Sequence, residues 1–191
     1  MKNLNLASRK ISTDFPAFVM GIVNCTPDSF FSASRGGAER AFELIEEGAD
    51  ILDLGGESTR PGSDYVSAEE EIKRIVPVIE EIRRKSDIPI SVDTRKKIVM
   101  QAAFDSGADI LNDISALEDD PELAFFAAEK KIPVVLMHKR GIPSTMQADT
   151  EYKNIFNEVS SYLEQRAEFA IKSGIEKEKI IVDPGIGFGK K

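Results

Sequence analysis

Short apolar runs alternate along the chain with longer stretches whose apolar residues recur at helical spacing. The runs are rich in Ile, Val and Leu and lack a polar alternation, which is typical of parallel strands buried on both faces. The pattern predicts strands over residues 18–23, 51–54, 88–92, 110–111, 132–137 and 179–182.

The stretches between these strands predict amphipathic helices with recognisable ends. Ser67 lies three residues before a glutamate, which is capping-box spacing, and Pro77 should either kink the helix that begins there or leave a carbonyl unpaired. Thr94 is a plausible cap for the next helix. Asp120-Pro121-Glu122 should open the one after it, with proline at the first helical position. Three glycines are placed to end helices in the left-handed conformation: Gly48, Gly107 and Gly174.

A small internal repeat supports a regular succession of βα units. Residues 48–53 (GADILD) recur as residues 107–112 (GADILN), each giving a helix end, a short turn, a strand and a polar strand end. Repeated units in one direction imply right-handed crossovers and a parallel sheet. The pattern fits an α/β fold, either a (β/α)₈ barrel or a doubly wound open sheet.

Polar residues stand at the end of almost every predicted strand. In a barrel the carboxyl ends of the strands ring one mouth, where barrel enzymes carry out chemistry. Each residue could instead cap the following helix. A whole ring favours a site, because a buried carboxylate is costly without a partner. The ring comprises Asn24, Asp53, Asp93, Asn112 with Asp113, His138 and Asp183.

Two long loops follow the first and second strands, over residues 25–37 and 55–63. They are rich in Gly, Ser and Pro and exceed a tight βα turn, so they are candidate lids or binding loops. Arg60 could clamp a phosphate or pair with Glu57. His138, the single histidine, cannot form a metal site alone and is expected to hydrogen-bond within the barrel.

Composition narrows the classes of partner. The 191 residues carry 25 basic and 33 acidic side chains, a formal net charge of −8, which argues against nucleic-acid or anionic-membrane partners. No apolar run approaches the roughly 20 residues that span a bilayer. Cys25 is the single cysteine, so an internal disulfide is excluded, and a cytoplasmic protein is expected.

Five segments together resemble the dihydropteroate synthases, folate-pathway enzymes of the pterin-binding family. The long ones are residues 20–30 (MGIVNCTPDSF) and 48–62 (GADILDLGGESTRPG). The short ones are residues 91–94 (SVDT), 112–114 (NDI) and 183–190 (DPGIGFGK). They occur in family order and cover essentially the whole chain.

The resemblance implies a TIM-type (β/α)₈ barrel, of which this chain would hold about six of the eight βα units, since a typical barrel takes about 250 residues. We therefore expect one pterin-binding domain over residues 1–191, incomplete at its C-terminus. The family's seventh-strand Ser-Arg-Lys and eighth-strand Arg-x-His cannot be mapped here. Ala116 stands where the family commonly has glycine, and residues 31–35 also depart from its pattern.

The implied reaction joins 6-hydroxymethyl-7,8-dihydropterin pyrophosphate to p-aminobenzoate, giving 7,8-dihydropteroate and pyrophosphate with Mg²⁺ assisting. By the same resemblance, Asp183 would accept two parallel pterin donors, while Asp93 and Asn112 would bind the rest of the ring. Asn24 would bind Mg²⁺ through its carbonyl oxygen. Asn24 and Asp93 are the predicted catalytic residues.

The resemblance implies further substrate contacts around this centre. They are Thr59 and Arg60 for the pyrophosphate, Ile114 and Met137 as apolar walls, and Phe30, Pro61 and Phe188 beside the p-aminobenzoate ring. No protein nucleophile is evident, so positioning and electrostatics would carry the rate.

The absent strands should expose two sheet edges, so little or no synthase activity is expected of the chain alone. Two other functions stay open. One is a corrinoid-dependent methyltetrahydrofolate methyltransferase, whose barrel also binds pterins. The other is a non-catalytic pterin-binding fragment completed by a second chain. Because the family usually dimerises through late helices, a homodimer stays open for a full-length parent.

Overall fold

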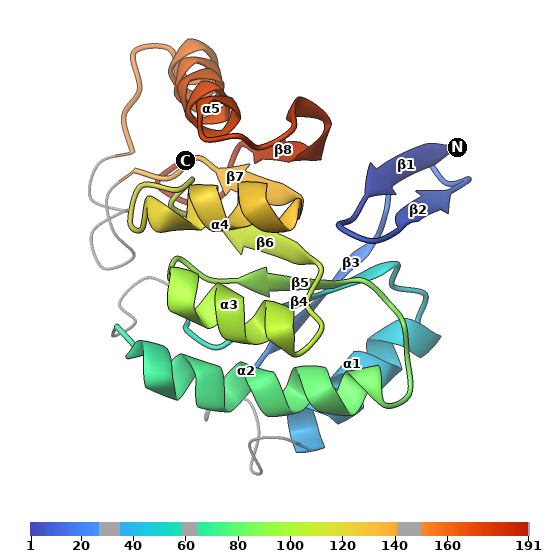
Figure 1. The fold of residues 1–191 in the computed structure, drawn as a ribbon. Helices are drawn as coiled ribbons and strands as arrows, with labels where there is room; N and C mark the ends of the chain where they lie inside the picture. The colour runs from blue at the N-terminus through green and yellow to red at the C-terminus, as the bar shows by residue number, and fades with distance from the viewer. Residues whose placement is uncertain (27–34, 59–64, 141–149, 191) are drawn as a thin grey trace.

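The computed structural model describes residues 1–26, 35–58, 65–140 and 150–190. Its main element is a parallel sheet of six strands, each within two residues of its predicted bounds at both ends (Figure 1). The strands are β3 (Met20–Asn24), β4 (Ile51–Gly55), β5 (Ile90–Asp93), β6 (Ile110–Asp113), β7 (Val134–Met137) and β8 (Ile180–Asp183). The helices are α1 (Arg35–Glu46), α2 (Ala68–Arg83), α3 (Lys97–Asp105), α4 (Glu122–Lys130) and α5 (Ile155–Lys172), with a 3₁₀ turn, η2 (Lys177–Lys179).

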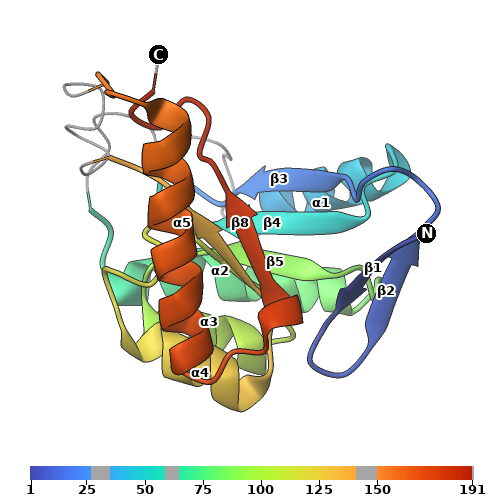
Figure 2. The same cartoon turned by 90° about the horizontal axis from the view of Figure 1, so that it is seen from above.

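The strands pair in chain order from β3 to β8, and the helices cover the outer face of the curved sheet (Figure 2). Sequential parallel pairing with helices on one face is the TIM-barrel arrangement, whereas a doubly wound sheet carries helices on both faces. The barrel prediction is confirmed, with six of the eight strands in the described residues. β3 and β8 form the two edges of this sheet.

The main hydrophobic core lies between the sheet and the helices. Alternate strand residues such as Leu52, Leu54 and Leu136 point into it and are fully buried. Ile75 and Ile79 of α2 cover them from outside. Burying each such side chain contributes about 1.5–3 kcal/mol, so this layer fixes which face of each strand points inward.

An N-terminal hairpin of β1 (Lys2–Asn5) and β2 (Lys10–Thr13) was not predicted from the sequence pattern. It lies at the tail end of the sheet strands, away from their arrowheads (Figure 2). Leu4 and Leu6 pack there in a second hydrophobic cluster, which we call the floor, with three inward-facing strand residues. Those residues are Ile51, Ile110 and Val135.

Most predicted helix ends are confirmed. The Ser67 hydroxyl accepts a hydrogen bond from the Glu70 N–H at 3.3 Å, and Pro77 lies inside α2. The prediction for Thr94 is wrong, because α3 begins only at Lys97, whose N–H donates to Asp120 Oδ2 at 2.8 Å. Pro121 precedes α4 by one residue rather than opening it. The three predicted glycines have positive φ: Gly48, Gly107 and Gly174.

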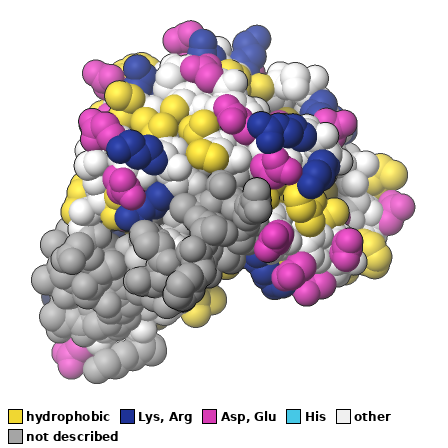
Figure 3. Space-filling model, turned by 90° about the horizontal axis from the view of Figure 1, so that it is seen from below, with side chains coloured by type: hydrophobic (Ala, Val, Ile, Leu, Met, Phe, Trp, Pro, Cys, Tyr) yellow, Lys and Arg dark blue, Asp and Glu magenta, His cyan; other side chains and the backbone are white. Residues whose placement is uncertain are grey.

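On the face shown in Figure 3, basic and acidic side chains are interspersed, with apolar side chains in small groups between them. The described part of that face therefore shows no broad basic field. Among the described helices, none is long and apolar enough to cross a membrane.

Candidate active site

Every second residue of the sheet strands faces away from the helices into what we call the lumen. The strand register aligns Asn24 with Gly55, Gly55 with Asp93, and Asp93 with Asn112, so four strands share one row. Asp183 lies on the same face, paired with Met137. Of the predicted ring residues, Asn24, Asp93, Asn112 and Asp183 thus lie on one face at the carboxyl ends of their strands, whereas Asp113 faces the helices.

Asn112 and Asp183 also line the same hollow, about 500 Å³ in volume, together with floor residues Ile51 and Val135. Asp93 adjoins it as the register partner of Asn112. Asn112 and Asp183, which are far apart in the sequence, therefore line one hollow, and Asp93 lies beside Asn112 on the same face of the sheet. Their role in binding stays a prediction.

Burial makes two carboxyl groups of the lumen, Asp53 and Asp93, weaker acids than usual. It raises the pKa of Asp93 well above its ordinary value, and the negative charges of Asp53, Asp113 and Glu71 add to this, with Arg95 opposing. Burial also raises the pKa of Asp53, although Ser91 and Asn112 partly offset the effect. Because a buried carboxylate is costly without a partner, these groups favour a ligand that supplies N–H donors.

The adjacent polar pair at the end of β6 divides between the two faces. Asn112 enters the lumen, whereas Asp113 is fully buried and accepts hydrogen bonds from the Ser115 N–H and hydroxyl at 2.7 Å and the Leu117 N–H at 2.8 Å. Asp113 therefore has the structural role of holding the turn after β6. Ala116 sits in this turn at φ 50°, a conformation that suits glycine.

The glycine-rich segment after β8 forms a tight turn around Asp183. Asp183 Oδ1 accepts the Gly185 N–H at 2.7 Å. Gly185 has φ 62°, and a Cβ there would lie 2.1 Å from the carbonyl oxygen of His138, so no side chain fits. Lys190 Nζ donates to the carbonyls of His138, Gly185 and Phe188 at 3.0, 2.9 and 3.0 Å, which uses its three N–H groups.

His138 acts mainly through its backbone and its ring faces. Its N–H donates to the Asp183 carbonyl at 2.9 Å, and its ring meets Tyr162 edge-on at 4.9 Å. Within the described residues Nδ1 has no hydrogen-bond partner, and burial, followed by the charge of Lys190, lowers the pKa of the ring. The backbone bond of His138 joins the ends of β7 and β8, and the expected side-chain hydrogen bond is not made by Nδ1.

Glu57, at the start of the second loop, is held by two cations that the sequence pattern did not predict as its partners. Its carboxylate pairs with the Arg95 guanidinium and with Lys96 Nζ, the latter at 2.5 Å. Lys96 also pairs with Glu71 at 2.6 Å, and Tyr65 covers both cations. The signal for Arg95 and Lys96 was their position just after the β5 strand end.

Some of the remaining predicted contact residues are described by the structure and others are not. Ile114 and Met137 are buried near the ends of β6 and β7, and Phe188 is half-buried in the turn after β8. Asn24 is exposed at the end of β3. Four predicted residues lie outside the described residues: Phe30, Thr59, Arg60 and Pro61.

Asn24 is the predicted metal ligand, and the structure allows a partial test of that role. In the described part of the chain, no group of three or more His, Cys, Asp or Glu side chains could hold a metal ion. Mg²⁺ commonly takes only one or two protein oxygens, with water and substrate phosphates filling the other positions. One exposed amide oxygen at the mouth suits that kind of substrate-borne metal.

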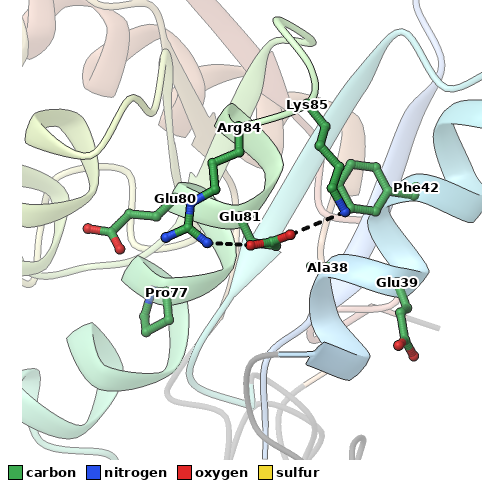
Figure 4. Close-up of a pocket in the computed structure, with 8 residues that line it drawn as sticks. All are labelled: Ala38, Glu39, Phe42, Pro77, Glu80, Glu81, Arg84 and Lys85. Atoms are coloured by element: carbon green, nitrogen blue, oxygen red, sulfur yellow. Dashed lines mark hydrogen bonds and ion pairs between the residues drawn. The ribbon is translucent and has the colours of Figure 1, made fainter.

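A second hollow of about 550 Å³ lies outside the barrel, between α1 and α2 (Figure 4). Its charged side chains are largely paired with one another. Glu81 binds Arg84 at 2.5 Å and Lys85 at 3.2 Å, and Lys85 lies 4.8 Å from the Phe42 ring centre. The lumen, with unmet hydrogen-bonding groups, is the better candidate for a binding site.

The chain is thus of the TIM-barrel class, and its carboxylates and amides stand at the strand ends, where barrel enzymes build their small-molecule sites. The comparison with known families is specific: the chain belongs to the pterin binding enzyme family, whose sequence pattern matches residues 20–191.

Individual relatives agree with this assignment. The chain is 43% identical over 178 residues to a dihydropteroate synthase from Synechocystis, covering 91% of this chain and 62% of that relative. It also resembles two solved structures of dihydropteroate synthase from Xanthomonas albilineans. The structure with 4-aminobenzoic acid has a TM-score of 0.88 and 43% identity, covering 99% of this chain and 68% of the other. The structure with 7,8-dihydropteroate has a TM-score of 0.85 and 38% identity, covering 100% and 68%.

Proposed function

We propose that this chain carries the pterin site of a dihydropteroate synthase. The reaction joins 6-hydroxymethyl-7,8-dihydropterin pyrophosphate to p-aminobenzoate and releases pyrophosphate. The observation that carries the proposal is the shared lumen face of Asp93, Asn112 and Asp183. Relatives that bind 4-aminobenzoic acid and 7,8-dihydropteroate support it.

Pterin recognition follows from the chemistry of these side chains. A pterin presents a ring N–H beside an amino group, and the Asp183 carboxylate is suited to accept both. Asp93 and Asn112 offer further polar partners within the same surface. A heterocycle that leaves one of these groups unpaired loses about 1–3 kcal/mol, which is a basis for selectivity.

The chain's residues bind and orient the reactants rather than form a covalent intermediate. The bond from the pterin methylene carbon to the pyrophosphate oxygen breaks, and its electron pair leaves with pyrophosphate. The aryl amine nitrogen bonds to the same carbon and then loses a proton. When bound, Mg²⁺ would stabilise the charge on the leaving group, with Asn24 supplying one oxygen ligand.

The 191-residue chain alone is proposed to have little or no turnover. β3 and β8 are unpaired edges of the described sheet, and lumen residue Ile22 is 64% exposed on β3. The chain also spans only about 62% of the Synechocystis relative. A cytoplasmic location, expected from a single free cysteine, belongs to the same proposal.

The open edges favour one second candidate, a pterin-binding fragment that needs another chain to act. A corrinoid-dependent methyltransferase is the remaining enzyme alternative. It would use methyltetrahydrofolate and would release no pyrophosphate when p-aminobenzoate is added.

The test combines calorimetric binding with a pyrophosphate-release assay. The pterin pyrophosphate with Mg²⁺ should bind the chain, whereas inorganic pyrophosphate alone should bind far more weakly. The full-length Synechocystis relative serves as the turnover control. Release equal to that control would reject the low-activity proposal, and no pterin binding would reject the pterin site.

The metal role has its own test. Asn24→Ala should raise the Mg²⁺ concentration needed to bind the pterin pyrophosphate. It should leave the affinity for 6-hydroxymethylpterin, which lacks pyrophosphate, unchanged. Equal weakening of both ligands would mean that Asn24 does not act through the metal.

A further inference from the structure

Asn112 can present either of two chemically opposite atoms to a ligand. Its amide carries a donor nitrogen and an acceptor oxygen, and a half-turn of the side chain exchanges them. In the structure, Nδ2 of Asn112 donates to Oδ2 of Asp53 at 3.0 Å. This contact commits the amide nitrogen to Asp53 and leaves Oδ1 for another donor.

We propose that Asp53 is a positioning residue that holds the Asn112 amide with Oδ1 toward the ligand. Asp53 thereby selects a heterocycle that offers an N–H at that point. The inference rests on the proposed function, because the ligand it concerns is the pterin. Asp53 itself contacts Asn112 and need not touch the ligand.

The geometry of the sheet makes this contact available. Asp53 lies on β4 and Asn112 on β6, so their side chains meet across β5. Ser91 is the lumen-facing residue of β5 paired with Asp53 in the register. A serine there is small enough to leave space for the contact, which a larger side chain would occupy.

The surroundings of Asp53 oppose the flipped amide. Its side chain is buried, with the residue only 8% exposed, so water does not readily replace a lost partner. Among the described residues, Asp53 Oδ1 and Ser91 Oγ have no well-formed hydrogen bond, although Ser91 is close enough to lower the pKa of Asp53. A flip would set Asn112 Oδ1 against Asp53 Oδ2 and leave a further acceptor unpaired.

The decisive experiment exchanges the two chemical groups. Asn112→Asp alone places two acceptors against each other and should weaken binding of the pterin pyrophosphate at least tenfold. Adding Asp53→Asn restores a donor to this contact, now from residue 53, and keeps an oxygen toward the ligand. The exchanged pair should recover affinity to within about threefold of the parent chain.

A matched control separates this contact from loss of charge. Asp105→Asn removes the same charge from the exposed end of α3 and should not rescue Asn112→Asp. If Asn112→Asp fails to fold, recovery of a cooperative unfolding transition by Asp53→Asn, but not by Asp105→Asn, is the corresponding result. Rescue by both variants, or by neither, would overturn the inference.

A readout without ligand keeps the inference distinct from the proposed function. In ¹⁵N spectra the Asn112 side-chain N–H signals, assigned by their loss in Asn112→Asp, should exchange slowly with solvent and shift in Asp53→Asn. Unprotected signals would overturn the contact. Protected signals in a chain that binds no pterin would support the contact and refute the pterin site together with the ligand half of the inference.

Discussion

At the floor of the lumen, Ile51, Ile110 and Val135 meet Leu4 and Leu6, and each is at most 9% exposed. Nearer the carboxyl ends of the sheet, inward positions hold the carboxyl groups of Asp53 and Asp93 and the amide of Asn112. Burial raises the pKa of both carboxyl groups, and Asp53 Oδ1 has no hydrogen-bond partner among the described residues. The strand alternation is the same at both ends. The comparison teaches that the floor stabilises the fold, while the mouth carries polar groups that the described residues leave without hydrogen-bond partners.

The largest expected effect belongs to the floor. Leu6→Ala should lower the free energy of unfolding by about 3 kcal/mol, because it removes buried methyl groups and leaves a cavity. Pterin affinity of the folded fraction should stay unchanged. Urea unfolding and calorimetric titration check the two parts, and a tenfold loss of affinity would mean that floor and mouth are not separable.

At the mouth, a substitution is expected to reduce ligand affinity more than stability. Asp183→Asn should weaken pterin binding about 30-fold, or about 2 kcal/mol, because an amide offers one acceptor where the carboxylate offered two. The unfolding free energy should change by less than about 1 kcal/mol. Asp113→Asn on the helix side of β6 is the comparison, and it should affect stability more than affinity.

A smaller effect should come from the charge of Asp93. Its raised pKa means that the folded chain binds the proton more tightly than the unfolded chain, so stability falls as pH rises from about 3.8 through the raised value. Asp93→Asn should therefore raise the free energy of unfolding by about 1 kcal/mol at pH 7. It should also bind pterin more weakly. The stability difference should vanish well below pH 3.8, where both states hold the proton. A variant less stable at pH 7 would contradict this account.

The smallest effect concerns the turn behind the mouth. Ala116→Gly should stabilise the chain by up to about 1 kcal/mol, because alanine is strained at φ 50°, with part of the gain lost to unfolded-state entropy. Thermal unfolding measures it. Gly185→Ala makes the contrasting change and should be strongly destabilising, since its Cβ would strike the His138 carbonyl.

The sheet was predictable because its signals are local. Buried parallel strands read as continuous apolar runs, and Gly48 and Gly107 mark where two helices end. The hairpin was missed because its four-residue strands carry one apolar residue each, Leu4 and Ile11. The prediction of Thr94 as a helix cap was wrong because the carboxylate of Asp120, from a distant segment, accepts the hydrogen bond of the first N–H of α3.

The candidate site was predictable only to the level of backbone placement. Parallel pairing alone brings Asp93, Asn112 and Asp183 to one end of the sheet. The contact of Asp53 with Asn112 depends on side chains reaching across β5, and the pairing of Glu57 with Arg95 joins residues 38 positions apart. Such contacts follow from three-dimensional packing, which a linear pattern does not encode.

The hairpin below the lumen has a consequence for kinetics. In a closed barrel with this floor, ligands would enter and leave the lumen mainly past the strand ends that carry Asp93, Asn112 and Asp183. Two ligands bound one above the other in such a lumen would be released in the reverse of the order in which they bound. The hairpin of β1 and β2 would thereby affect the order of ligand binding, although it lies at the opposite end of the strands from the candidate site (Figure 2).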